Sequence, residues 1–190
     1  MKKAIWFPVI VLCIGLSSIA ARAHQQNKPE EKPTIASVLD RQLSIVEREF
    51  VSAAEAMPEE KYSFAPTNGE FKGVRTFAEQ VKHVAAANHL FFGAIVAEKY
   101  DAGPGENGPD SVKTKAEIVK YLRESFALGH RAIATITAEN VVTPVKNPPN
   151  PMLNTPLALA SIGCWHSFDH YGQMVEYLRM NGIIPPESRK

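Results

Sequence analysis

The chain has 190 residues, of which 45% are hydrophobic and 22% are charged, and its formal net charge at pH 7 is +1. Basic residues occur singly or in isolated pairs, so the composition excludes a nucleic-acid-binding surface and favours a small molecule or a metal ion as the ligand. The length is that of one ordinary domain with a real hydrophobic core.

The first 23 residues have the order of an export signal. Two lysines follow Met1, residues 4–20 are largely apolar, and Ala21-Arg22-Ala23 offers a small-x-small cleavage site. We therefore expect an exported protein, periplasmic or secreted, that is cleaved after Ala23. An uncleaved N-terminal anchor is the alternative, but the apolar run is at the short end for a membrane span.

Removal of this segment would leave a single domain. Residues 24–33 carry no apolar side chain except prolines and predict a flexible lead-in, so the folded domain is expected over residues 34–190. Cys164 would then be the only cysteine, and packing rather than an internal disulfide has to stabilise the fold. The exposed amine and imidazole of His24 offer a separate, less favoured chelate for copper.

The first two predicted helices cover residues 34–57 and 76–100. Apolar side chains recur at helical spacing through the first, which Pro58 ends. The second opens with Thr76-Phe77-Ala78-Glu79, which has the form of a capping box. A loop rich in proline, glycine and aromatic residues joins the two.

The third and fourth predicted helices cover residues 114–138 and 155–181. Thr114-Lys115-Ala116-Glu117 repeats the capping pattern, and Thr155-Pro156 places a proline at the first helical position. Gly182 suits the left-handed residue that ends a helix.

No stretch alternates apolar and polar residues over the length of a strand. The sequence therefore predicts an all-α four-helix bundle, preceded by the cleaved signal. Its connections of roughly 18, 14 and 16 residues exceed simple hairpins, and such loops often build sites, so we expect them to cover one end of the bundle.

A histidine pair marks the fourth helix. His166 and His170 are four residues apart, which places them about 40° apart on one face and one turn from each other. Asp169 and Gln173 share that face. Burying these groups is costly without partners, and a metal ion with bound water would satisfy them.

The second helix supplies a third candidate ligand, His83, beside the small residues 85–87. Glu79, one turn earlier, is a candidate to orient it. Alone, His83 is better explained as a hydrogen-bonded core histidine, but three histidines together favour a metal site with room for a substrate.

Three other reactive side chains are expected to lie elsewhere. His89 is about 240° around the helix from His83, and His130 has no periodic partner on its own helix. Cys164 lies about 200° from His166, which argues against a thiolate ligand at the same centre. We expect packing or structural roles for all three.

Two segments resemble the DinB-like family: residues 77–85, FAEQVKHVA, and residues 166–186, HSFDHYGQMVEYLRMNGIIPP. The resemblance extends over roughly residues 35–187. It implies a four-helix bundle that holds zinc, nickel or another divalent ion through one histidine of the second helix and two of the last, here His83, His166 and His170. The family includes thiol-dependent S-transferases and isomerases.

Three neutral imidazoles leave a coordination position open, which is typical of catalytic sites. We therefore predict a metal-dependent hydrolase or S-transferase acting on a small molecule, with Glu79, Asp169 or Gln173 in supporting roles. An exported metal- or ligand-binding bundle without turnover is the alternative, and a bundle that uses the histidines for packing is a third. We expect no nucleic-acid partner and no stable membrane anchor, and a homodimer through an exposed helix face is compatible with the sequence.

Overall fold

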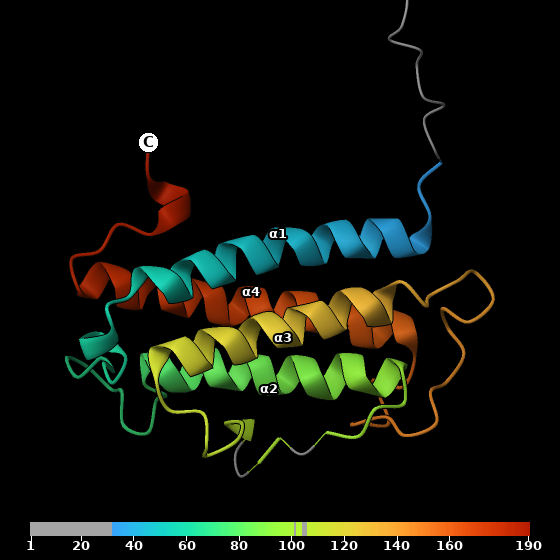
Figure 1. Ribbon diagram of the computed structural model, residues 1–190, viewed down its shortest axis with the longest axis horizontal. Coiled ribbons are helices and arrows are strands. Elements are labelled where there is room, and N and C mark those ends of the chain that lie inside the picture. Colours follow the sequence, from blue (N-terminus) through green and yellow to red (C-terminus); the bar gives the residue numbers. More distant parts are fainter. Residues whose placement is uncertain (1–31, 101, 104–105) are drawn as a thin grey trace, which may run out of the picture. The chain divides into compact units, whose positions relative to one another are not determined.

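The structure is a computed structural model that describes residues 32–100, 102–103 and 106–190 (Figure 1). Its described part is helical and contains no strand, which confirms the all-α four-helix prediction. The helices are α1 (Ile35–Ala56), α2 (Phe77–Ile95), α3 (Lys115–Ile133) and α4 (Pro156–Met180), with short 3-10 turns at η1 (Glu59–Lys61) and η3 (Pro186–Ser188).

Two sequence predictions fall on other parts of the chain. The signal at residues 1–23 and residues 24–31 of the predicted lead-in lie outside the described residues, so both stay predictions. Among the described helices, none combines the length and the apolar character that a membrane span requires.

Helices α1 and α2 lie diagonally across the bundle, and each packs against both α3 and α4 (Figure 1). Helices α1 and α4 run in one direction and α2 and α3 run in the other. Because α2 and α3 are parallel, the connection between them has to return along the length of the bundle. It passes beside α2, where Lys82 Nζ donates to the carbonyl of Pro109 at 3.0 Å. The expectation that the loops cover one end is therefore wrong for this connection.

The predicted helix starts are confirmed by their hydrogen bonds. The side chains of Thr76 and Thr114 accept from the amides of Glu79 and Glu117, whose carboxylates accept in return from the threonine amides. At the end of α4, Gly182 has a φ of +73° and completes the left-handed stop that the sequence predicts.

Two helices end earlier than the sequence indicates. Helix α2 stops at Ile95 because Ala97 takes a left-handed φ of +58° and the amide of Glu98 returns to the carbonyl of Gly93 at 2.9 Å. Helix α3 stops at Ile133, and the Thr135 hydroxyl donates to the carbonyl of Ala132 at 2.7 Å. Neither stop carries the glycine or proline that marks a helix end in a sequence.

The ring of Phe92 on α2 is fully buried in the core. Two glycines let α3 and α4 approach this ring. A Cβ atom added at Gly129 would lie 2.7 Å from a Leu43 methyl carbon, and one added at Gly163 would overlap the Phe92 ring. Gly163 is therefore a packing requirement of the α2 and α4 contact, although it lies inside a helix.

We expect Gly163→Ala to lower the free energy of unfolding by about 1–3 kcal/mol, the usual cost of overpacking a core. The matched control is Gly172→Ala on the same helix, where an added Cβ meets nothing within 4 Å. That change should raise stability by up to about 1 kcal/mol through helix propensity alone. Urea denaturation of both variants measures the difference, and two equal stabilisations would contradict the packing role.

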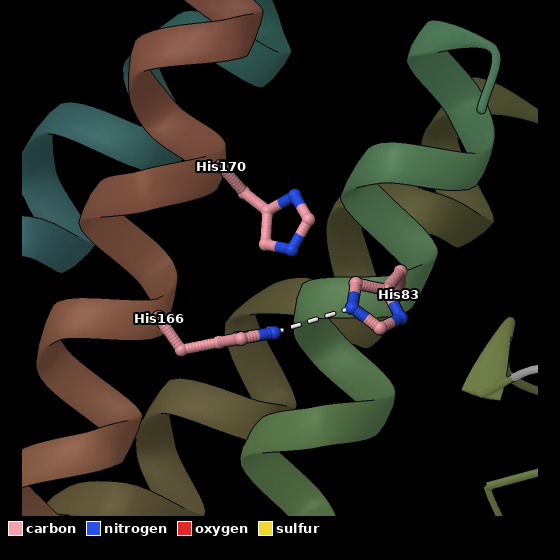
Figure 2. A group of neighbouring side chains, drawn as sticks. All are labelled: His83, His166 and His170. Atoms are coloured by element: carbon pink, nitrogen blue, oxygen red, sulfur yellow. Dashed lines mark hydrogen bonds between the residues drawn. The ribbon is translucent and has the colours of Figure 1, made fainter. Parts of the chain in front are cut away.

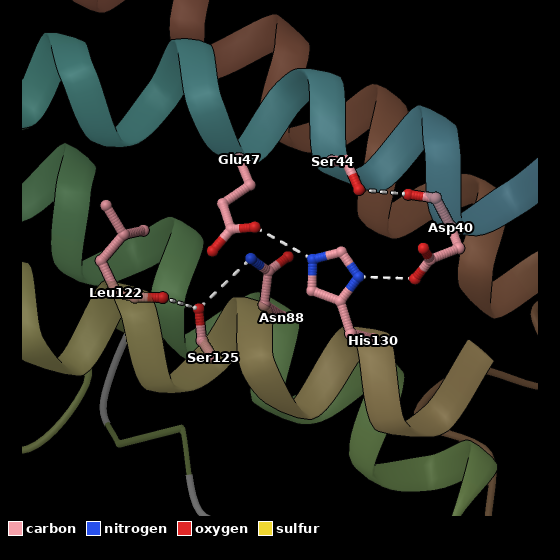
Figure 3. Close-up of polar contacts among 7 residues, drawn as sticks. All are labelled: Asp40, Ser44, Glu47, Asn88, Leu122, Ser125 and His130. Atoms are coloured by element: carbon pink, nitrogen blue, oxygen red, sulfur yellow. Dashed lines mark hydrogen bonds and ion pairs between the residues drawn. The ribbon is translucent and has the colours of Figure 1, made fainter. Parts of the chain in front are cut away.

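His130 joins α3 to α1 (Figure 3). Its Nδ1 lies 2.6 Å from a carboxylate oxygen of Asp40, and its Nε2 lies 2.9 Å from one of Glu47. Both nitrogens can donate to these acceptors only when the ring is protonated. Burial disfavours the charge, but the hydrogen bonds to Asp40 and Glu47 outweigh it and raise the pKa of His130. The structural role expected for this residue is confirmed.

The raised pKa makes the contribution of His130 to stability depend on pH. This contribution is complete below the unfolded-state pKa of about 6.5 and is lost as the pH rises through the higher pKa of the folded state. We therefore expect the difference in unfolding free energy between the wild type and His130→Gln to shrink as the pH rises from about 6 to about 9. Arg131→Gln, which removes an exposed cation from the same helix, should show no such trend.

Candidate metal centre

Three imidazoles meet at the contact between the antiparallel helices α2 and α4 (Figure 2). His83 projects from α2 toward His166 and His170, which lie one turn apart on α4. One ring nitrogen from each residue falls in a group whose members all lie within 4.8 Å of one another. The structure thus brings together the three histidines that the sequence singles out.

The spacing of the nitrogens fits a shared metal ion. Nε2 of His83 and Nε2 of His166 are 3.2 Å apart. Two nitrogens bound to one zinc ion at about 2.0–2.1 Å and at the tetrahedral angle are separated by about 3.3 Å. The rings of His83 and His166 therefore need little movement to bind one ion, and a nitrogen of His170 lies within 4.8 Å of both.

Burial keeps these rings uncharged. Burial first, and then the charges of neighbouring histidines and of Arg75, lower the pKa of His170 to about 3 and that of His166 to about 4. The pKa of His83 is lowered as well, again chiefly by burial and then by the charge of Arg75. At neutral pH all three rings have the unprotonated nitrogen that a metal ligand requires.

Hydrogen bonds at the outer nitrogens orient two of the rings. Nδ1 of His83 lies 3.0 Å from the carbonyl oxygen of Glu106, and Nδ1 of His170 lies 2.6 Å from Oε1 of Gln80. Both partners are oxygen acceptors, so each Nδ1 carries the proton and each Nε2 keeps its lone pair. This is the arrangement found behind histidines that bind metals.

His166 completes the group in a different way. Its Nδ1 is buried and has no hydrogen-bond partner among the described residues, and its Nε2 faces the Nε2 of His83. Two imidazole lone pairs pointing at each other repel unless a proton or a cation lies between them. A metal ion at this point would satisfy both nitrogens, so the donor set fits such an ion.

The predicted supporting residues fall into two groups. Glu79 does not orient His83, because its carboxylate accepts from the amide and hydroxyl of Thr76 at 2.7 and 2.9 Å as part of the helix cap. The Glu106 carbonyl takes that place. Asp169 and Gln173 form the second group and share a hydrogen bond, in which Gln173 Nε2 donates to Asp169 Oδ2 at 3.3 Å.

Sequence reasoning missed Gln80 and Glu106. Gln80 lies one turn before His83, and its side chain is 3% exposed. Its position on the histidine face of the helix was the signal available in the sequence. Glu106 acts through its backbone carbonyl, and no residue type marks such a contact.

The other candidates lie away from the centre, as expected. His89 packs between the rings of Tyr100 and Tyr121, with centroid distances of 4.7 and 5.3 Å. Cys164 is buried, and burial raises the pKa of its thiol to about 11, so the thiol stays protonated at neutral pH. Neither residue belongs to the group of three histidines among the described residues.

An open cleft of about 470 Å³ borders the centre. Gln80, which bonds His170, and Gln173 lie in its wall, and the rest of the wall includes Arg75, Glu79 and Asn107. Arg75 Nε donates to Asn107 Oδ1 at 3.0 Å, which positions the guanidinium group in the cleft. The wall is thus polar and carries both signs of charge.

Comparison with known proteins agrees with this description. The family model of the DinB superfamily matches residues 42–174, which include all three histidines and most of the four helices. A comparison with curated proteins found no match. Because the family match covers well over half of the chain, the protein belongs to the DinB superfamily.

Proposed function

We propose that His83, His166 and His170 bind one divalent transition-metal ion and that the protein is a metal-dependent enzyme acting on a small molecule. One observation carries the proposal: three neutral imidazoles converge from two helices, with Nε2 atoms of His83 and His166 at the separation of neighbouring metal ligands. Nitrogen donors of this kind suit zinc, nickel and related ions.

Three protein ligands favour catalysis over a closed structural site, in which four protein ligands are usual. When bound, such an ion would supply the Lewis acidity that hydrolysis and group transfer both use. The protein's own part is to hold the three imidazoles neutral and to present a polar cleft beside them. Arg75 lies in that cleft and acts electrostatically on all three histidines. We infer that a substrate enters there and that its polar groups bind Arg75 and the exposed amide of Gln173.

Metal titration tests the centre directly. We expect the purified chain to bind one equivalent of Zn²⁺ or Ni²⁺, as measured by calorimetry and elemental analysis. His83→Ala and His166→Ala should each weaken binding by more than about 100-fold, since loss of an outer-shell partner alone costs about 10- to 100-fold. His89→Ala, which removes a histidine of α2 outside the centre, is the matched control. Stoichiometric binding that survives His166→Ala would refute the assignment.

Turnover is a separate test. Hydrolysis of ester, amide and thiol-conjugate substrates should appear with the metal-loaded chain, disappear on chelation and return when the ion is restored. His170→Ala should abolish the same activity. Turnover that persists without the ion would contradict the catalytic proposal, whereas tight binding without any turnover would favour an ion- or ligand-binding bundle.

A further inference from the structure

A line of hydrogen bonds leads from the protein surface to His170. It begins at the exposed carboxylate of Asp169, which accepts from Gln173 Nε2 at 3.3 Å. The Oε1 of Gln173 accepts from Gln80 Nε2 at 2.8 Å, and the Oε1 of Gln80 lies 2.6 Å from Nδ1 of His170. The line crosses from α4 to α2 and back.

The carboxylate of Asp169 fixes which group donates and which accepts at each hydrogen bond of this line. An ionised carboxylate can only accept hydrogen bonds, so the amide group of Gln173 that faces Asp169 has to be the NH₂. The oxygen of Gln173 then faces Gln80, which presents its own NH₂ in that direction and its oxygen to His170. An oxygen facing Nδ1 requires the proton of the neutral ring to be on Nδ1.

The reverse order is disfavoured for the same reason. If Gln80 turned its NH₂ toward His170, its oxygen would face Gln173, and the oxygen of Gln173 would in turn face the Asp169 carboxylate. Two acceptors would then meet with no proton between them. Reversal would also protonate Nε2 of His170, the nitrogen that faces His83 and His166.

We propose that Asp169, Gln173 and Gln80 form a relay that fixes the tautomer of His170, holding its Nε2 bare for a ligand bond. Gln80 is the positioning residue that touches His170, and Asp169 sets the direction from the surface. The effect of this relay on metal affinity rests on the proposed function, but the tautomer of His170 does not.

Burial makes Gln80 suited to this role. Its side chain is 3% exposed, so water competes little for its amide, and a buried amide with one bond broken is costly. His170 is 7% exposed. The last step of the relay, from Gln80 to the buried ring of His170, therefore passes through an amide that has few other partners.

Nitrogen NMR of the histidine rings in the full chain, recorded without metal and then with one equivalent of Zn²⁺, measures the tautomer. We expect the wild type to carry the His170 proton on Nδ1 in both states. Gln80→Leu should allow a mixture of tautomers and weaken Zn²⁺ binding by about 10- to 100-fold. A wild-type His170 with its proton on Nε2 would overturn the proposal.

Two isosteric changes separate the relay from general stability. Asp169→Asn keeps the shape but offers both a donor and an acceptor, so both directions become available and His170 should populate both tautomers. Adding Gln173→Glu moves the carboxylate one step inward, where it again accepts from Gln80. The double variant has the wild-type net charge and should restore the proton to Nδ1 and most of the lost Zn²⁺ affinity.

Glu176→Gln is the charge control, because it removes one carboxylate from the exposed side of α4 outside the relay. It should leave the His170 tautomer unchanged. A tautomer that Asp169→Asn does not alter, or that the double variant fails to restore, would refute the relay. Failure of the wild type to bind Zn²⁺ would instead refute the proposed function and leave the tautomer result standing.

Discussion

The antiparallel contact between α2 and α4 is the constraint on which the candidate site depends. It brings His83 against the pair His166 and His170 at a depth where burial keeps all three rings neutral. Neutral rings are ready ligands, but their facing lone pairs need a cation or a proton between them. Without an ion, the 3.2 Å contact between His83 and His166 requires a proton on one Nε2, which the neutral His166 ring can supply and which a bound metal ion would replace.

The parts of the fold that the sequence predicted well are those set by local chemistry. The capping boxes at Thr76 and Thr114 involve residues three apart, and the pairing of His166 with His170 needs only the period of one helix. The early end of α2 escaped prediction because Ala97 takes a conformation usually left to glycine. The turn that ends the helix is local, with the amide of Glu98 returning to the carbonyl of Gly93, but no residue type marks it in the sequence.

The partners of the histidines show where local reasoning fails. Glu79 was assigned to His83 because it lies one turn away on the same helix. Its carboxylate instead accepts from the backbone amide of Thr76 as part of the helix cap. The carbonyl of Glu106 reaches His83 only because the connection after α2 returns along the bundle. That path follows from the parallel arrangement of α2 and α3, a property of the whole topology that no single segment carries.

His130 shows that histidine position alone does not define a ligand. It bridges α3 to α1 as the three histidines bridge α2 to α4, and it too is partly buried. Its facing groups are the carboxylates of Asp40 and Glu47, which stabilise a charged ring and occupy both nitrogens. The rings at the other contact face one another, a backbone carbonyl and an amide, and burial keeps them neutral, with one nitrogen of each turned inward. The neighbours of each imidazole therefore decide whether it acts as a cation that joins helices or as a donor available to a metal ion.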